Sequence, residues 1–244
     1  MSGPLRVIRP GTHPAQAGTN AASVDPADAV RDARFRGYYE TARTGLLDLL
    51  DTAPGCVLEI GCGGGANLSE LKRRYPACRT VGVELQPEAA AVALRHHAVD
   101  EVRSGDILDA AAVDFADASF DVIVMSHVLE HFSEPARVIA RALPWLAPQG
   151  RLLVALPNVR HVSVLLELFW RGDFRYRDAG ILDATHLRFF TRKSALRFFQ
   201  HNGLQVDKAV PDIDGAKSRL LHGLSLGLAS DFAAFAHNFL LRKR

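Results

Sequence analysis

The sequence predicts one doubly wound α/β domain built on a mostly parallel sheet. Two observations carry this prediction: short apolar runs alternate with segments whose apolar residues recur at helical spacing, and the first run leads directly into a glycine-rich loop. Alternation of strand and helix implies crossover connections and parallel strands. Near-continuous apolar strands also suit a sheet that is covered on both faces. The five runs are residues 56–60, 80–84, 101–104, 120–125 and 151–156.

Helical segments are expected between these strands and before the first of them. The earliest, residues 38–50, gathers its leucines on one face and is expected to dock on the sheet. The connecting helices are expected at residues 67–75, 87–97 and 135–146.

The pattern changes after residue 157. A strongly apolar helix is expected at residues 162–170, followed by a basic and aromatic segment. Thr191 has the side chain of an N-cap for a helix that ends near residue 200, and Gly203 stands just past that end. Two last strands are expected at residues 204–210 and 235–241, joined by a helix-like linker.

Length and composition fit one sizeable globular domain of 244 residues, with a net charge of +2 that does not by itself imply nucleic acid. Residues 1–30 are rich in small and polar residues, so we expect a flexible tail before a domain at residues 31–244. No apolar run reaches the roughly 18 residues of a membrane span, and the N-terminus lacks the apolar core of a secretory signal. Cys56, Cys62 and Cys78 fit neither a disulfide set nor a zinc pattern, which indicates reduced thiols and a cytoplasmic location.

The glycine-rich loop follows the first predicted strand. Gly61, Gly63 and Gly65 let the backbone turn sharply and let a ligand approach the amides, and the next helix presents free N–H donors. The spacing is also compatible with a dinucleotide fingerprint, and a tight turn without a ligand is a further alternative. Glu84 ends the second strand, where an acid can accept both ribose hydroxyls. Asp106 follows the third strand, where it can accept from an adenine amino group, and this second acid favours a single nucleoside.

Three stretches resemble motifs of the class I S-adenosylmethionine-dependent methyltransferases. Residues 57–65, Val-Leu-Glu-Ile-Gly-Cys-Gly-Gly-Gly, resemble the glycine-loop motif, and residues 120–131, Phe-Asp-Val-Ile-Val-Met-Ser-His-Val-Leu-Glu-His, resemble the fourth motif. Residues 143–157 resemble the turn and fifth strand, although Gln149 stands in that surface turn where the family usually has glycine. The resemblance spans residues 38–241 and implies seven strands in the order 3-2-1-4-5-7-6, with the seventh strand antiparallel.

The resemblance implies S-adenosylmethionine as the cofactor and assigns residues to it. The loop would approach the methionine portion, the two acids would hold ribose and adenine, and the end of the fourth strand would lie beside the sulfonium. The cofactor-binding residues implied in this way are Glu59, Gly61, Gly63, Gly65, Glu84, Leu85, Asp106, Ile107, Ser126 and His127.

Three histidines are candidates for chemistry at the acceptor. His127 and His131 have a spacing that shares one helix face, but a zinc site needs a third ligand and the family motif already accounts for the pair, so we expect no metal. His186 lies in residues 183–191, Asp-Ala-Thr-His-Leu-Arg-Phe-Phe-Thr, which resemble a segment near the acceptor site of bacterial methyltransferases associated with cell-surface sugars and secondary metabolites. His186 and His131 are therefore the catalytic candidates, as a base or as groups that orient the acceptor. The alternative for His186 is a structural role that pins the loop, with Asp183 as its partner.

The stretch 158–192 interrupts the alternating pattern, and we expect it to form the acceptor side of the site. Basic and aromatic residues interleave at 171–197, which suits a small-molecule acceptor that is anionic or lipid-linked, although a solvated surface explains them equally well. No RNA or DNA module surrounds them, so no nucleic-acid partner is expected. The helix at 162–170 resembles the insertion with which ubiquinone-pathway O-methyltransferases approach membranes, which implies peripheral membrane contact; a lid or pocket wall is the simpler alternative.

Three functions remain open at this stage. The first is methyl transfer to a small molecule, at an oxygen of a sugar, secondary metabolite or lipid-linked acceptor. The second is a nicotinamide-dependent oxidoreductase, which the glycine loop allows but Asp106 and the fourth motif oppose. The third is a non-catalytic protein that binds S-adenosylmethionine, because no single side chain is indispensable for methyl transfer. The sequence leaves the identity of the acceptor and the oligomeric state open.

Overall fold

The computed structural model describes residues 41–95, 99–213, 219, 222–223, 226 and 229–244. The chain divides into two units, Met1–Arg36 and Gly37–Arg244, and the described residues all belong to the second. The tail expected at residues 1–30 lies outside them, as do the first residues of the helix expected at 38–50 and part of the linker before the last strand.

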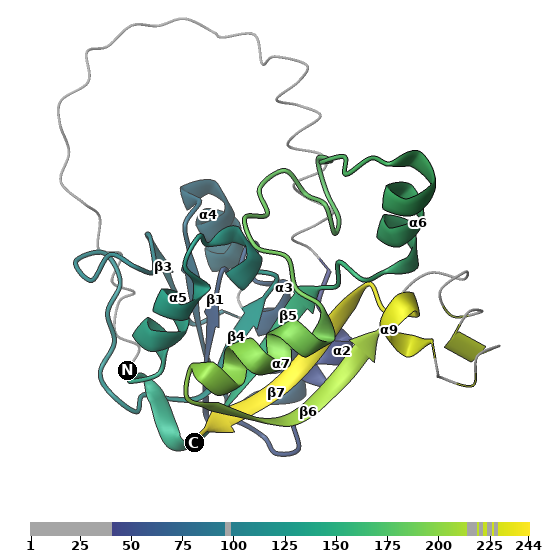
Figure 1. Cartoon of the computed structure of the whole chain (residues 1–244). Coiled ribbons are helices and arrows are strands. Elements are labelled where there is room, and N and C mark those ends of the chain that lie inside the picture. Colours follow the sequence, from purple (N-terminus) through teal and green to yellow (C-terminus); the bar gives the residue numbers. More distant parts are fainter. Residues whose placement is uncertain (1–40, 96–98, 214–218, 220–221, 224–225, 227–228) are drawn as a thin grey trace, which may run out of the picture. The chain divides into compact units, whose positions relative to one another are not determined.

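Seven strands form one sheet in the order β3-β2-β1-β4-β5-β7-β6, which confirms the predicted topology (Figure 1). Strands β1 to β5 run parallel to one another, whereas β7 is antiparallel to both β5 and β6. The strands are β1 (Cys56–Ile60), β2 (Arg79–Glu84), β3 (Glu101–Ser104), β4 (Phe120–Ser126), β5 (Leu146–Pro157), β6 (Leu204–Asp212) and β7 (Ala236–Lys243).

Helices cover both faces of this sheet because successive strand residues point to opposite sides. Val57 packs in a core with leucines of α2 and α3, whereas Leu58 packs in the opposite core with Val138 of α5 and Phe199 of α7. The helices are α2 (Thr44–Leu47), α3 (Ala66–Arg74), α4 (Pro87–Arg95), α5 (Pro135–Ala142), α6 (Val162–Arg171), α7 (Arg192–His201) and α9 (Ser230–Ala233), with a short 3-10 helix, η1 (Leu129–His131), after β4.

Two helices are shorter than predicted. The expected helix at residues 135–146 ends at Ala142, because Pro144 has no N–H to continue it, and the chain enters β5 at Leu146. Of the helix expected at residues 38–50, the described residues form only the short helix α2. Its leucines, Leu46 and Leu47, pack against the sheet as predicted. By contrast, Thr191 caps α7 as expected, in a capping box closed by Ser194.

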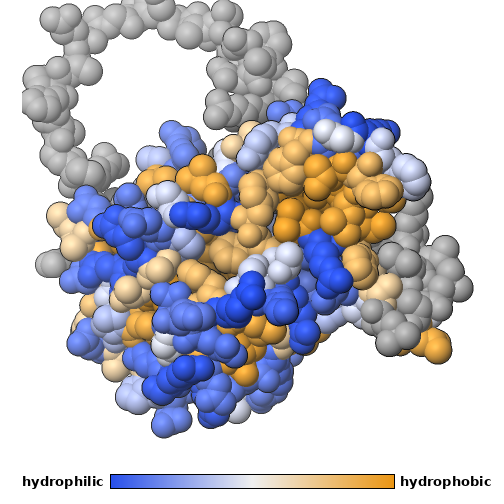
Figure 2. Space-filling model, viewed as in Figure 1, coloured by the Kyte–Doolittle hydropathy of each residue, from blue (hydrophilic) through white to orange (hydrophobic). Residues whose placement is uncertain are grey.

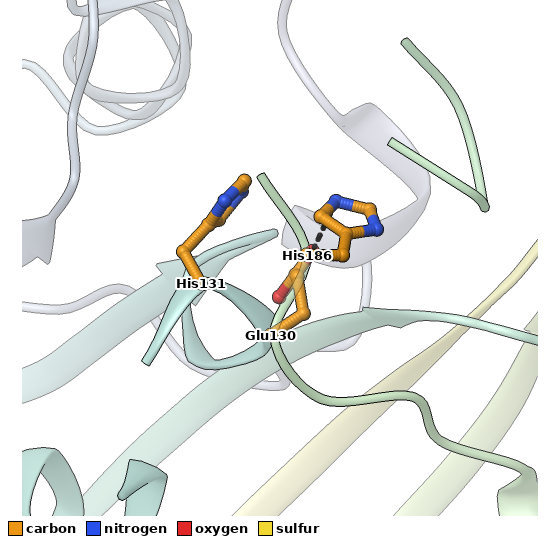
Figure 3. A group of neighbouring side chains, drawn as sticks. All are labelled: Glu130, His131 and His186. Atoms are coloured by element: carbon orange, nitrogen blue, oxygen red, sulfur yellow. Dashed lines mark ion pairs between the residues drawn. The ribbon is translucent and has the colours of Figure 1, made fainter. Parts of the chain in front are cut away.

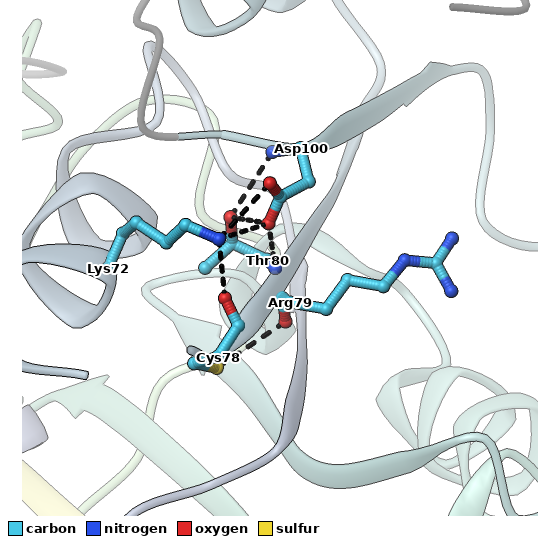
Figure 4. Close-up of polar contacts among 5 residues, drawn as sticks. All are labelled: Lys72, Cys78, Arg79, Thr80 and Asp100. Carbon is cyan, nitrogen blue, oxygen red and sulfur yellow. Dashed lines mark hydrogen bonds and ion pairs between the residues drawn. The ribbon is translucent and has the colours of Figure 1, made fainter. Parts of the chain in front are cut away.

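A polar network ties the beginnings of β2 and β3 to the end of α3 (Figure 4). Lys72 donates to the Cys78 carbonyl at 2.7 Å and forms an ion pair with Asp100 at 2.9 Å. Asp100 in turn accepts from the backbone N–H and the hydroxyl of Thr80. The network holds the amino ends of these strands in place. The glycine loop lies at the opposite, carboxyl ends of the parallel strands. Cys56, Cys62 and Cys78 are all unpaired thiols.

No helix within the described part of the chain has both the length and the apolar character needed to cross a lipid bilayer.

Candidate functional site

The glycine loop connects β1 to α3 at the carboxyl edge of the sheet. Gly61, Gly63 and Gly65 all have positive φ, at 69°, 53° and 83°, a conformation that side chains with a Cβ rarely adopt. The N–H groups of Gly61 and Cys62 donate to the Val83 carbonyl, which anchors the loop to β2. The backbone therefore needs glycine at these three positions before any ligand is considered.

Glu84, the last residue of β2, faces this loop. It is 7% exposed, and its Oε2 accepts the Gly63 N–H at 2.8 Å while its Oε1 accepts the Gln86 N–H at 2.9 Å. A carboxylate has about four lone-pair positions, so these two bonds hold the group and leave acceptor capacity for ligand hydroxyls. Leu85 follows with 61% of its surface exposed, the exposure expected of an apolar platform for a planar ring.

Glu59 is buried beside the loop and only partly satisfied. Its Oε1 accepts from the Asn67 side-chain amide at 2.7 Å, whereas its Oε2 has no hydrogen-bond partner among the described residues. Burial, together with the charge of Glu84, raises the pKa of Glu59 to about 8. A buried acid with an unused oxygen suits a cationic ligand group such as an ammonium, which would favour its charged form. The sequence analysis did not single out Asn67. Its only signal in the sequence is its position in the first turn of α3, directly after the glycine loop.

Asp106 and Ile107 stand at the same edge, after β3. Asp106 is exposed, and its Oδ1 accepts the Leu108 N–H at 2.9 Å in a local turn, while Ile107 is buried. Three acids, one for each of β1, β2 and β3, thus gather along one edge, as the parallel topology requires.

The end of β4 lies directly against the glycine loop. A Cβ built on Gly61 would come within 2.7 Å of Val128 Cγ2, so the loop and the turn after β4 are in close contact. Ser126 is half-buried, and His127 has a positive φ of 56° with its N–H donating to the Ala155 carbonyl. A non-glycine residue in this conformation is uncommon and frequently marks a functional turn.

Residues 183–188 are clamped onto η1, which brings two distant parts of the chain together. The N–H groups of Leu187 and Arg188 donate to the Glu130 carbonyl at 2.8 and 3.0 Å. The Arg188 guanidinium also donates twice to the Ser133 carbonyl, at 2.8 and 2.6 Å. As a result, the rings of His131 and His186 meet edge to face with centroids 4.8 Å apart, above the buried carboxylate of Glu130 (Figure 3).

The hydrogen bonds of the two imidazoles differ from the pairing considered from sequence. His186 Nδ1 bonds the Ile181 carbonyl at 2.9 Å rather than Asp183. Asp183 Oδ1 instead accepts from the hydroxyl of Thr185 at 2.6 Å, and that hydroxyl contacts His131 Nδ1 at 3.1 Å. Burial lowers the pKa of His186, so its imidazole is neutral near neutral pH, while His131 is exposed.

The segment between β5 and α7 forms a wall beside this cluster. A cavity of about 610 Å³ lies between α6 and the loop that contains Ile181, whose carbonyl also holds His186. Hydrophobic side chains gather on the outer surface over α6 (Figure 2). The large exposed ones on α6 and just after it are Leu166, Leu168, Phe169, Trp170, Phe174 and Tyr176.

The sheet order, the glycine loop and the row of acids define a nucleoside-binding protein with the architecture of the class I methyltransferases. The chain belongs to the methyltransferase domain family, whose model matches residues 31–209. Membership of this family indicates S-adenosylmethionine as the methyl donor.

Sequence relatives include a ubiquinone biosynthesis O-methyltransferase of Xanthomonas oryzae, 29% identical over 168 residues, a match that covers 64% of this chain and 68% of that protein. A protein of unknown function from a Streptomyces fradiae transposon is 34% identical over 118 residues, which is 46% of this chain but only 33% of the relative. Among solved structures, a possible histamine N-methyltransferase of Thermotoga maritima has a TM-score of 0.61 at 17% identity, with 89% of this chain and 97% of that chain covered. That last likeness shows the fold alone.

The residues present fit S-adenosylmethionine. The unused buried oxygen of Glu59 suits the cofactor's ammonium group, and the fixed carboxylate of Glu84 suits its ribose hydroxyls. Glu130 was not among the residues that sequence reasoning proposed for the site. The sequence gives one signal for it, a charged residue beside His131 in an otherwise apolar stretch, because Glu is almost never fully buried unless it is paired.

Proposed function

We propose that this protein transfers a methyl group from S-adenosylmethionine to an oxygen of a small-molecule acceptor. One observation carries the proposal: the loop expected to hold the cofactor touches, through Gly61 and Val128, the turn that leads to the His131 and His186 pair. The proposed sites for the methyl donor and for the acceptor are therefore adjacent. Because methyl transfer is an in-line displacement, adjacency of this kind supplies much of the rate.

Residues of this chain would position both reactants. Glu59, the loop glycines and Ser126 would hold the methionine portion of the cofactor, with Glu84 and Leu85 at the ribose, Asp106 and Ile107 at the adenine, and His127 near the sulfonium. When bound, S-adenosylmethionine would supply an electrophilic methyl group to the acceptor oxygen and leave as S-adenosylhomocysteine, and the hydroxyl proton would pass to water.

The acceptor would lie against His131, whose ring is exposed, with His186 buried behind it. Methylation at oxygen is supported by the name of the ubiquinone-pathway relative and by the imidazole pair, which can hold a hydroxyl group. Residues 158–192 would select the acceptor, because they form both the clamp over η1 and one wall of the cavity. A lipid-linked acceptor is supported by the apolar surface of α6, which would contact a membrane from one side.

The test uses tag-free protein with S-adenosylmethionine that carries a labelled methyl group, incubated with pools of sugars, phenols and lipid-linked extracts. We expect label to appear on an acceptor oxygen. With that acceptor, His131→Ala would remove a group that positions the hydroxyl, so it should reduce turnover by about 10²-fold and leave cofactor affinity unchanged. Transfer of label to nitrogen, or no transfer with any pool despite normal cofactor binding, would contradict the proposal, the second result in favour of a non-catalytic binding protein.

The surface of α6 gives a second test. Wild-type protein should co-sediment with vesicles of anionic phospholipid, and Phe169→Ser with Trp170→Ser should reduce that binding at least tenfold while cofactor affinity is retained. Equal sedimentation of the wild type and the double variant would leave α6 as a lid or pocket wall.

A further inference from the structure

We propose that Glu130, His131 and His186 form a binding site for one divalent transition-metal ion such as Zn²⁺. One nitrogen of each imidazole and one carboxylate oxygen of Glu130 lie within 4.8 Å of one another, and the three side chains are neighbours in the fold (Figure 3). Two imidazoles and a carboxylate are a donor set that binds Zn²⁺ and similar ions while leaving further coordination positions open. Small side-chain rotations would bring these atoms to ligand distance.

The state of Glu130 is the strongest argument for a cation. The side chain is 1% exposed, yet neither carboxylate oxygen makes a hydrogen bond within the described residues. Its neighbours are imidazoles: His127 Nδ1 lies 3.3 Å and His186 Nε2 lies 3.9 Å from Oε1, and neither contact is aligned as a hydrogen bond. A buried carboxylate without hydrogen bonds is costly, and a bound metal ion is one of the few groups that compensates for it.

Both histidines already have the outer contacts that metal-bound imidazoles use. His186 Nδ1 must be the donor to the Ile181 carbonyl, which leaves Nε2 unprotonated toward Glu130. Thr185 donates its hydroxyl proton to Asp183 and so accepts from His131 Nδ1, which leaves Nε2 of His131 unprotonated. Each ring is thereby held in one orientation with a lone pair available. The sequence analysis expected no metal because it considered His127 with His131 alone, whereas this set draws its third ligand from the clamped loop.

The role of the ion rests on the proposed function. Bound beside the acceptor pocket, it would take the acceptor hydroxyl into an open coordination position and lower the pKa of that hydroxyl, whose proton passes to water. The resulting oxygen is a better nucleophile toward the methyl group. This assigns to the acceptor an exposed hydroxyl that can reach the ion.

The test is titration of Co²⁺, a spectroscopic substitute for Zn²⁺, into protein without a histidine tag after treatment with EDTA. We expect one equivalent to bind with visible ligand-field absorption that Zn²⁺ displaces. Glu130→Gln, His131→Ala and His186→Ala should each weaken Co²⁺ binding by about 10²-fold or more, and Thr185→Val by about tenfold, the scale of an outer-shell change. His201→Ala is the matched control. It alters an exposed histidine at the end of α7 and should leave the affinity for Co²⁺ unchanged.

Affinity for S-adenosylhomocysteine, measured by calorimetry on the same variants, separates this inference from the proposed function. Preserved affinity shows that a variant is folded and that only the metal site is lost. Absence of a saturable Co²⁺ signal in the wild type, or a signal that survives in all three ligand variants, overturns the metal site even if methyl transfer is observed. Conversely, Co²⁺ binding without methyl transfer to any acceptor would keep the metal site and remove the proposed function.

Discussion

Replacement of Glu84 by alanine tests the proposed cofactor site at a carboxylate that is held in place by hydrogen bonds to both of its oxygens. In the structure Glu84 accepts N–H groups of Gly63 and Gln86, and S-adenosylmethionine would add ribose hydroxyls to the same oxygens. A hydrogen bond to a charged group contributes about 1.5–3 kcal/mol, and water entering the cavity offsets part of the loss. We therefore expect Glu84→Ala to weaken binding by about 1–3 kcal/mol, which is roughly 5–150-fold in Kd.

The assay is calorimetric titration with S-adenosylhomocysteine, together with turnover at saturating cofactor. Glu84→Gln keeps one oxygen for the Gly63 N–H and should retain more thermal stability than Glu84→Ala while still losing affinity. Glu88→Ala, an exposed acid in the first turn of α4, is the matched control. Turnover should change little, because the ribose lies away from the transferred methyl group. An unchanged Kd in Glu84→Ala, or a large loss of turnover with normal affinity, would refute this placement of the ribose.

Three further predictions concern the loop and the buried titratable groups. Gly63→Val should abolish cofactor binding, because the new side chain would occupy space that the ligand needs. The protein should still fold, because the backbone strain at a φ of 53° costs only about 1–2 kcal/mol. Normal affinity in calorimetry would mean that the loop is only a turn. Without ligand, Glu59 holds a proton in the folded state between its ordinary pKa of 4.5 and about 8, so the free energy of unfolding should fall as the pH rises through that range. Glu59→Gln should remove this slope in urea titrations, and a slope that persists would assign it elsewhere. Burial lowers the pKa of His237 to about 4, so stability should fall as the pH drops from 6.5 toward that value, and His237→Leu should reduce this acid sensitivity in thermal melts.

The strand pattern was readable from sequence because it depends on local information. Parallel strands buried on both faces are apolar throughout, and the predicted run at residues 120–125 matches β4 (Phe120–Ser126) to within one residue. The glycine loop was readable for a similar reason, since positive φ values restrict the residue types that fit. The end of α5 was predicted too late. The apolar spacing continues to residue 146, whereas Pro144, a local signal, ends the helix earlier.

The acceptor side could be predicted only in outline. His131 and His186 were each recognised in a motif, but the hydrogen bonds from Leu187 and Arg188 that bring them together depend on tertiary structure. The pairing of His186 with Asp183, considered as an alternative, followed sequence proximity, whereas in the folded loop the imidazole bonds the Ile181 carbonyl. The unsatisfied carboxylate of Glu130 is a property of burial, which no single position in the sequence reveals.

The most direct measurement of the central claim is calorimetric titration of the purified chain with S-adenosylmethionine, S-adenosylhomocysteine and NAD in parallel. We propose that Glu59, Glu84 and the glycine loop hold one nucleoside with a cationic amino acid attached. The account predicts one-to-one saturable binding of both adenosyl compounds and none, or far weaker binding, of NAD. Tight binding of NAD with no response to S-adenosylhomocysteine would contradict it.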